Sequence, residues 1–203
     1  CALPIYYRSN NKMSGDLQSE KVKDIHQDLI DRCRNNDRIA QMKLYDLYYR
    51  AVYNSIYRMV KDPMEAEDLM QDAFLSAFTS MTSFRSESSF GTWIKRIAIN
   101  KSLNALQKKS PEFLDIPDSA IPEMSENDDK THQKFSIEEI KEEIEHLPEG
   151  YRVVLNLHLI EGMDHDEIGQ ILNIKPVSSR SQYMRARKKL VMNLTDKNHA
   201  RQA

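Results

Sequence analysis

The stretch DHDEIGQILNIKPVSSRSQYMRARKKL, residues 164–190, decides the fold of the C-terminal part of this chain. Asp164 opens a short run with helical spacing, and Glu167 follows where an acidic side chain favours a helix start. The turn 173–175 separates this run from a second, strongly basic run that begins near Pro176. Two helices joined by so short a turn are typical of the helix-turn-helix motif, whose second helix enters the major groove of DNA.

The second helix of this motif carries side chains that suit contact with duplex DNA. In the major groove Arg pairs with guanine and Gln with adenine, while basic residues farther along a helix hold phosphates. Residues 175–201 contain eight basic residues and one acidic residue. The candidate DNA-contacting residues are Ser178, Ser179, Arg180, Gln182, Tyr183, Arg185, Arg187 and Lys188. Lys175 has no side-chain acceptor and is a poor cap, so the helix begins either at Pro176 or later, with Ser178 as its cap.

Apolar residues at helical spacing predict helices along most of the chain. The expected helices are 22–35, 38–60, 63–81 and 90–108, followed by 136–148, 149–161, 164–172 and 176–194. In the second of these the expected buried face is Leu44, Leu47, Tyr48, Val52, Ile56 and Met59. The expected packing of the helix-turn-helix motif is Leu155, Leu159, Ile168, Ile171, Leu172, Ile174 and Leu190. Ser136 and Glu139 form a capping-box pattern at the start of the fifth helix.

Composition agrees with a helical, water-soluble protein. Hydrophobic residues make up 40% and charged residues 30%, with five glycines among 203 residues, which disfavours an all-β chain with many tight turns. No apolar stretch is long enough for a membrane span, and two cysteines cannot build a disulfide framework. The N-terminus lacks a signal-peptide pattern, so we expect a cytoplasmic protein.

Charge divides the chain into three parts. Residues 111–150 carry 3 basic and 13 acidic residues, whereas 1–110 and 151–203 each have an excess of four basic residues. Segment 110–135 contains three prolines and no apolar period, which indicates a linker. We therefore predict an all-α fold of two small helical modules on an acidic linker. The expected organisation is an N-terminal lead 1–21, a first module 22–109, the linker 110–135, a second module 136–196 and a tail 197–203.

The helix that begins at Pro63 has an acidic face. Asp68 and Asp72 are four residues apart, so their carboxylates share that face. Paired carboxylates can serve acid–base chemistry or bind a metal, but no further ligand follows at suitable spacing. A solvated face or a docking face for a basic partner is the preferred interpretation.

The segment 84–100, FRSESSFGTWIKRIAIN, places aromatic residues beside basic ones. Such a pattern can stack unpaired bases and hold the phosphates of a single strand. Each aromatic residue taken alone, Trp93 and Phe90 included, is more often part of a packed core than of a binding site.

Taken together, residues 62–78, 84–100, 147–154 and 181–190 resemble bacterial extracytoplasmic-function (group IV) RNA polymerase sigma factors of the sigma-70 family. The resemblance covers about residues 22–194 and implies that the first module is sigma domain two and the second sigma domain four. It implies docking on the β′ clamp of core RNA polymerase through Glu65, Asp68, Leu69, Gln71, Asp72 and Phe74, and the β flap as a further contact of the polymerase. It implies contact with the minus-ten promoter element, including a flipped base, through Phe84, Arg85, Ser86, Phe90, Trp93, Arg96, Asn100 and Lys101.

The same resemblance implies that the helix-turn-helix motif reads the minus-35 element as duplex, and that a separate anti-sigma factor is a further partner. It implies no enzymatic activity, cofactor, metal or small-molecule substrate. One alternative is a conventional helix-turn-helix regulator that binds duplex DNA without being a polymerase subunit. A hydrolase that uses the cluster 164–167 is disfavoured, because capping explains the cluster and neither a nucleophile nor a glycine-rich phosphate loop accompanies it.

Overall fold

The computed structural model describes residues 25–110 and 135–202, and the regular secondary structure in those ranges is entirely helical. The first module contains α1 (Gln27–Arg34), α2 (Arg38–Val60), α3 (Pro63–Thr79), the 3₁₀ turn η1 (Met81–Ser83) and α4 (Phe90–Lys109). The second module contains α5 (Ile137–Glu145), α6 (Glu149–Leu159), α7 (His165–Leu172) and α8 (Pro176–Gln202). The predicted all-α class is confirmed. The predicted lead and nearly all of the predicted linker lie outside the described residues.

Side-chain caps fix where several helices begin. Asp37 accepts hydrogen bonds from the amides of Ile39 and Ala40 in α2, and Asp62 accepts one from the amide of Glu65 in α3, where Pro63 is the first helical residue. Ser89 caps α4 through the amide of Thr92. The predicted capping box at Ser136 is present at the start of α5. These starts were predictable because each cap is a local interaction between residues close in sequence.

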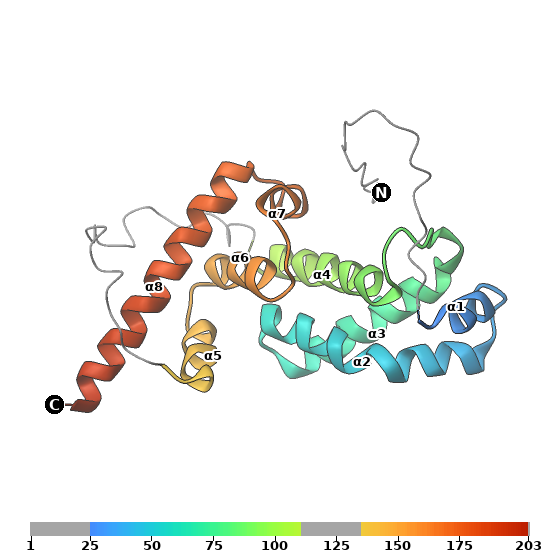
Figure 1. Ribbon diagram of the computed structural model, residues 1–203, viewed down its shortest axis with the longest axis horizontal. Coiled ribbons are helices and arrows are strands. Elements are labelled where there is room, and N and C mark those ends of the chain that lie inside the picture. The colour runs from blue at the N-terminus through green and yellow to red at the C-terminus, as the bar shows by residue number, and fades with distance from the viewer. Residues whose placement is uncertain (1–24, 111–134, 203) are drawn as a thin grey trace.

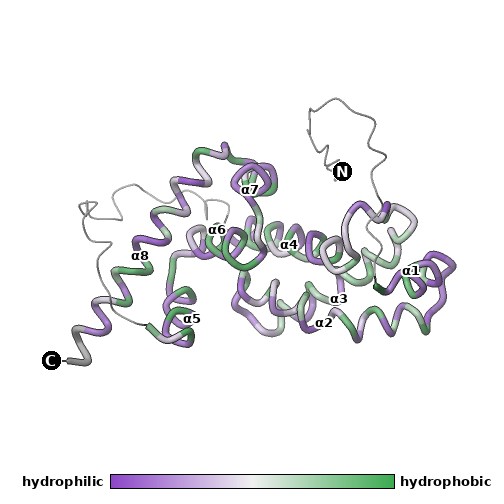
Figure 2. The backbone as a smooth tube through the Cα atoms, in the orientation of Figure 1, coloured by the Kyte–Doolittle hydropathy of each residue, from purple (hydrophilic) through white to green (hydrophobic). Residues whose placement is uncertain are grey.

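The first module is built around α2, which packs against α3 and α4 (Figure 1). Its buried positions follow four-residue steps through Leu44, Val52 and Ile56. Leu47 was predicted on this face but is 51% exposed, so the neighbouring helices leave this edge of α2 uncovered at that turn. In Figure 2 hydrophobic and hydrophilic residues alternate along α2, as expected for a helix with one buried face.

The second module packs α5, α6 and α7 against the long helix α8 (Figure 1). A small core joins α6 and α8, with α5 packed against it, and it consists of Leu147, Tyr151, Leu155, Ala186, Leu190 and Leu194. Leu159 was expected in this packing but is 55% exposed, since it is the last residue of α6. None of the described helices is long and apolar enough to cross a membrane.

The two modules touch each other through α2 and α6. Val153, Val154 and Leu157 of α6 are fully buried and belong to one continuous core with the apolar residues of α2, α3 and α4. This contact holds the turn between α6 and α7 beside the first module, near α4 (Figure 1).

Candidate nucleic-acid interface

The turn between α7 and α8 has the geometry that the helix-turn-helix pattern predicted. Asp164 and Glu167 cap α7 reciprocally, each side chain accepting the other's backbone amide at 2.7 and 3.2 Å. Asn173 ends α7 in the left-handed conformation, with φ 55°. A Cβ on Gly169 would lie 2.9 Å from the carbonyl oxygen of Ile174, so only glycine allows the turn to fold back so closely.

Helix α8 begins at Pro176, which settles the start of the basic helix. The amide of Ser179 donates to the carbonyl of Lys175 at 3.1 Å, as expected when Pro176 is the first helical residue. A later start with Ser178 as cap is not observed. Ser178, Arg180 and Arg187 are therefore exposed along α8, while Gln182, Tyr183, Arg185 and Lys188 are half-buried.

Ser179 differs from its neighbours on α8 because it is fully buried. Its hydroxyl lies 3.0 Å from Nδ1 of His165 on α7. His165 in turn stacks on His158 of α6, with ring centroids 4.5 Å apart, and Tyr183 packs edge-on against His158. Three helices thus meet at a polar aromatic cluster that fixes the angle of α8.

The sequence pattern did not indicate this cluster, because its side chains come from three separate helices. Nδ1 of His158 lies 2.8 Å from the carbonyl oxygen of Met163, which holds the loop between α6 and α7. Burial, together with the charges of His158 and Arg180, lowers the pKa of His165 below its ordinary value. The cluster therefore favours a neutral imidazole at His165.

The loop between η1 and α4 turns its aromatic residues inward. Phe84 and Phe90 are buried, and Trp93 packs on both rings at centroid distances of 5.0 and 5.9 Å. Ser86 is buried with φ 58°, a left-handed conformation that non-glycine residues adopt rarely. Arg85 is exposed on this loop. The loop is thus a shaped, packed structure with Arg85 at its surface.

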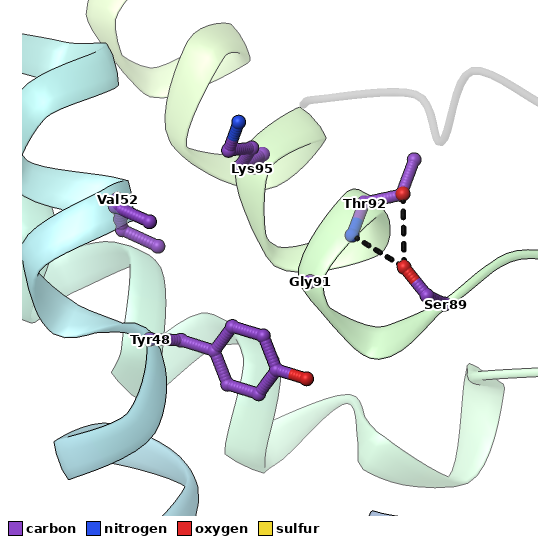
Figure 3. Close-up of a pocket in the computed structure, with 7 residues that line it drawn as sticks. Tyr48, Val52, Ser89, Gly91, Thr92 and Lys95 are labelled. Atoms are coloured by element: carbon purple, nitrogen blue, oxygen red, sulfur yellow. Dashed lines mark hydrogen bonds between the residues drawn. The ribbon is translucent and has the colours of Figure 1, made fainter. Parts of the chain in front are cut away.

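A shallow hollow lies between α2 and the start of α4 (Figure 3). Its lining is Tyr48, Ala51, Val52, Ser89, Gly91, Thr92 and Lys95. A Cβ on Gly91 would lie 2.8 Å from the Tyr48 ring, so glycine lets the two helices approach here. In Figure 3 the hydroxyl end of Tyr48 points toward the turn that contains Gly91 and Ser89. The sequence pattern did not indicate this hollow, because its lining comes from two separate segments.

The polar residues of α4 that the sequence singled out differ in their exposure and in their partners. Asn100 is exposed, and Lys101 lies 4.0 Å from the carboxylate of Asp72 on α3. Arg96 donates to Glu167 of α7 at 2.9 Å, and Lys95 donates to Glu161 in the loop between α6 and α7 at 3.0 Å. The second module therefore already engages two cations of α4.

The acidic face of α3 lies on the surface. Asp68, Gln71 and Asp72 are exposed, and Leu69 is half-buried. Glu65 accepts a hydrogen bond from Lys109 of α4. Phe74 is 2% exposed and packs against Tyr45 of α2, so it holds α3 against α2 instead of lying on the surface. Within residues 25–110 and 135–202 no group of three or more acidic, histidine or cysteine side chains could hold a metal ion.

Comparison with known proteins assigns both modules. Residues 44–112 match the family Sigma-70 region 2, and residues 137–190 match the family Sigma-70, region 4. The chain is 31% identical over 183 residues to the ECF RNA polymerase sigma factor SigW of Bacillus subtilis, covering 82% of this chain and 95% of that protein. It is 31% identical over 173 residues to the RNA polymerase sigma-H factor of Pseudomonas aeruginosa, covering 79% of this chain and 89% of that protein.

A solved structure shares the fold. It is the sigma factor RpoE of Bartonella quintana, determined in complex with the anti-sigma factor NepR, with a TM-score of 0.51 and 21% identity. The match covers 76% of this chain and 96% of that one. Two family regions in the expected order, together with relatives matched over nearly their whole length, place this chain in the extracytoplasmic-function family of sigma-70 RNA polymerase sigma factors.

Proposed function

We propose that this protein is an alternative sigma factor that binds core RNA polymerase and directs promoter-specific initiation of transcription. The observation that carries the proposal is the pairing of two helical modules that match sigma regions 2 and 4, in that order, on one chain. In this proposal the protein acts by binding and positioning other molecules, and it needs no bound cofactor.

The second module reads the minus-35 element as duplex in this proposal. Ser178 and Arg180 are exposed at the front of α8, where a helix in the major groove meets base edges. Arg187 lies two to three turns later and suits a phosphate. Ser179, predicted as a contact, is assigned instead to holding α7 against α8 through His165.

The first module reads the melted minus-ten element. Arg85 and Asn100 are exposed and can contact the strand directly. The buried rings of Phe84 and Phe90 hold the loop in shape, with Trp93 packed beside them. Such a loop can read a flipped base, because a base that has left the stack exposes its edge to the protein.

The polymerase-docking surface in this proposal is the exposed acidic face of α3. Asp68, Gln71 and Asp72 present carboxylates and an amide to a basic surface of the β′ clamp, and the second module meets the β flap. The structural relative was solved with an anti-sigma factor, which supports a separate partner of that kind for this chain. Such a sigma factor works beside the polymerase, in the cytoplasm.

The test is run-off transcription with purified chain, core RNA polymerase freed of other sigma factors, and fragmented genomic DNA of the same source. Discrete new transcripts that share upstream sequences are expected. The variant with Asp68→Lys and Asp72→Lys is the control, since it should lose the transcripts while remaining folded. Tight sequence-specific binding to duplex DNA without polymerase, and no new transcripts, would instead establish a conventional helix-turn-helix regulator.

A further inference from the structure

We propose that Val177 and Met184 of α8 read the C5 methyl groups of two thymines in the minus-35 element, so that this chain prefers duplexes with A·T pairs at those two positions. The inference rests on the proposed function, which assigns α8 to that duplex. Neither residue belongs to the polar and basic set that the sequence pattern singled out on this helix.

Val177 and Met184 are large apolar side chains on the outside of a strongly basic helix. Their exposed fractions are 67% and 56%. Scattered exposed apolar residues are common on protein surfaces, so exposure alone would carry nothing. What distinguishes these two residues is their position relative to each other and to the exposed arginines of α8.

Val177 and Met184 lie on one line along α8. They are seven residues apart, which is about two helical turns, so their side chains share a face. Arg180 is exposed between them, three residues after Val177 and four before Met184. The first turns of α8 therefore present an apolar, a cationic and a second apolar side chain in sequence along the same face.

The packed side of α8 fixes the direction in which this line points. Ser179, Ala186 and Leu190 are buried, and the hydroxyl of Ser179 lies 3.0 Å from Nδ1 of His165 on α7. A roll of α8 that buried Val177 or Met184 would expose these residues instead. In Figure 1 the start of α8 lies beside α7, while α5 packs nearer its other end. The line is thus at the end of α8 that enters the major groove in a helix-turn-helix protein.

The chemistry of the two side chains selects thymine among the four bases. In the major groove the edges of guanine, adenine and cytosine present hydrogen-bonding groups, whereas thymine also presents a methyl group. Val177 has no polar side-chain atom, and the sulfur of Met184 is a weak acceptor. Either side chain placed against the other bases would take water from polar groups without replacing their hydrogen bonds. Against a thymine methyl, the same contact buries apolar surface on both partners.

The helix geometry also sets the spacing of the two thymines. Seven residues correspond to about 10 Å along the helix axis, and successive base pairs are about 3.4 Å apart along DNA. The two thymines should therefore be about three base pairs apart. Arg180 reaches a position between them, where a guanine suits its guanidinium.

The first experiment removes one methyl group at a time from the DNA. The holoenzyme is reconstituted from core polymerase and the full chain, and the probe is a promoter fragment recovered by run-off transcription. Each thymine of its minus-35 element is replaced singly by deoxyuridine, which keeps base pairing and lacks only the methyl. Competition binding should show a loss of about fourfold at each of two positions about three base pairs apart. Deoxyuridine just outside the element should leave the affinity unchanged.

Variants of the chain assign each methyl group to its reader. Val177→Ala should abolish the loss at one position and Met184→Ala the loss at the other, as expected for two independent contacts. The matched control is Val191→Ala, which is on the same side of α8 but seven residues beyond Met184, and it should keep both losses. Met184→Gln should change the preferred base at its position from thymine to adenine, because glutamine pairs with adenine in the major groove.

The outcomes separate this inference from the sigma function itself. Methyl reading is overturned if no thymine of the element responds to deoxyuridine, or if both alanine variants respond as the unaltered chain does. Absence of promoter-specific transcripts would count against the sigma function. The same substitutions would then be made in a duplex that the full chain alone selects from a random pool, with binding followed by fluorescence anisotropy. Losses at two positions there would support methyl reading by a conventional regulator, and no loss would overturn it.

Discussion

Two faces of the first module differ in how the free chain presents them. The acidic face of α3, with Asp68, Gln71 and Asp72, lies open on the surface. The basic side of α4 is covered in part, since Lys95 and Arg96 are paired with glutamates of the second module. The difference teaches that the chain leaves its acidic surface available to a partner, whereas part of its basic surface is already engaged by the second module.

The largest effect is expected from reversing the charge on the acidic face of α3. Asp68→Lys combined with Asp72→Lys should weaken binding to core polymerase at least about a hundredfold, because charge complementarity across an interface becomes repulsion. Both side chains are exposed, so thermal stability should change little. Core binding by fluorescence titration and a melting curve on the same sample check both points. Unchanged core affinity would remove α3 from the docking surface.

The next largest effect is expected from a substitution at the turn between α7 and α8, which should destabilise the second module. In Gly169→Ala the new Cβ would lie 2.9 Å from the Ile174 carbonyl oxygen and 3.3 Å from the Pro176 nitrogen, both backbone atoms that cannot move aside easily. We expect a loss of about 2 kcal/mol in the free energy of unfolding of this module, as for other overpacked sites. Duplex minus-35 binding should fall while core binding through α3 persists. Denaturant unfolding followed by circular dichroism measures the loss.

A smaller and more selective effect is expected at the front of α8. Arg180→Ala should weaken binding to a minus-35 duplex about tenfold, the range expected for one lost base or phosphate contact. Arg180 is exposed, so folding and core binding should stay as they are. The matched control is Gln170→Ala on α7, an exposed position outside α8. Equal losses in the two variants would show that Arg180 makes no special contact.

Much of this architecture was predictable, because helices and their caps depend on residues close in sequence. Two helix starts were predicted from residue pairs, Asp164 with Glu167 and Ser136 with Glu139. The structure contains both capping boxes. The approximate helix ranges followed from apolar spacing for the same reason. The positions of Leu47 and Leu159 were wrong because spacing alone does not say which edge of a helix a neighbour covers.

The contacts between the modules could not be predicted in this way. Glu161 lies in a short loop with no period, and its partners Ser55 and Lys95 are 106 and 66 residues away in sequence. Only the approach of α6 to α2 brings these groups together. The contact between Ser179 and His165 was not predicted for the same reason. From the sequence alone, a serine at the front of a basic helix suits a base contact as well as a bond to a neighbouring helix.

The smallest expected effect concerns pH and the cluster that orients α8. Because burial, His158 and Arg180 lower the pKa of His165, the unfolded chain binds a proton there more readily than the folded one. Stability therefore rises with pH in this range and is lost as pH falls below about 6.5, the ordinary value for histidine. Between pH 7.5 and 5.5 the melting temperature of the second module and its affinity for minus-35 duplex should both decrease modestly. In His165→Gln, which keeps a polar partner for Ser179, the decrease should be smaller. An equal decrease in both proteins would place the titrating group elsewhere, and the cluster would then orient α8 through packing alone.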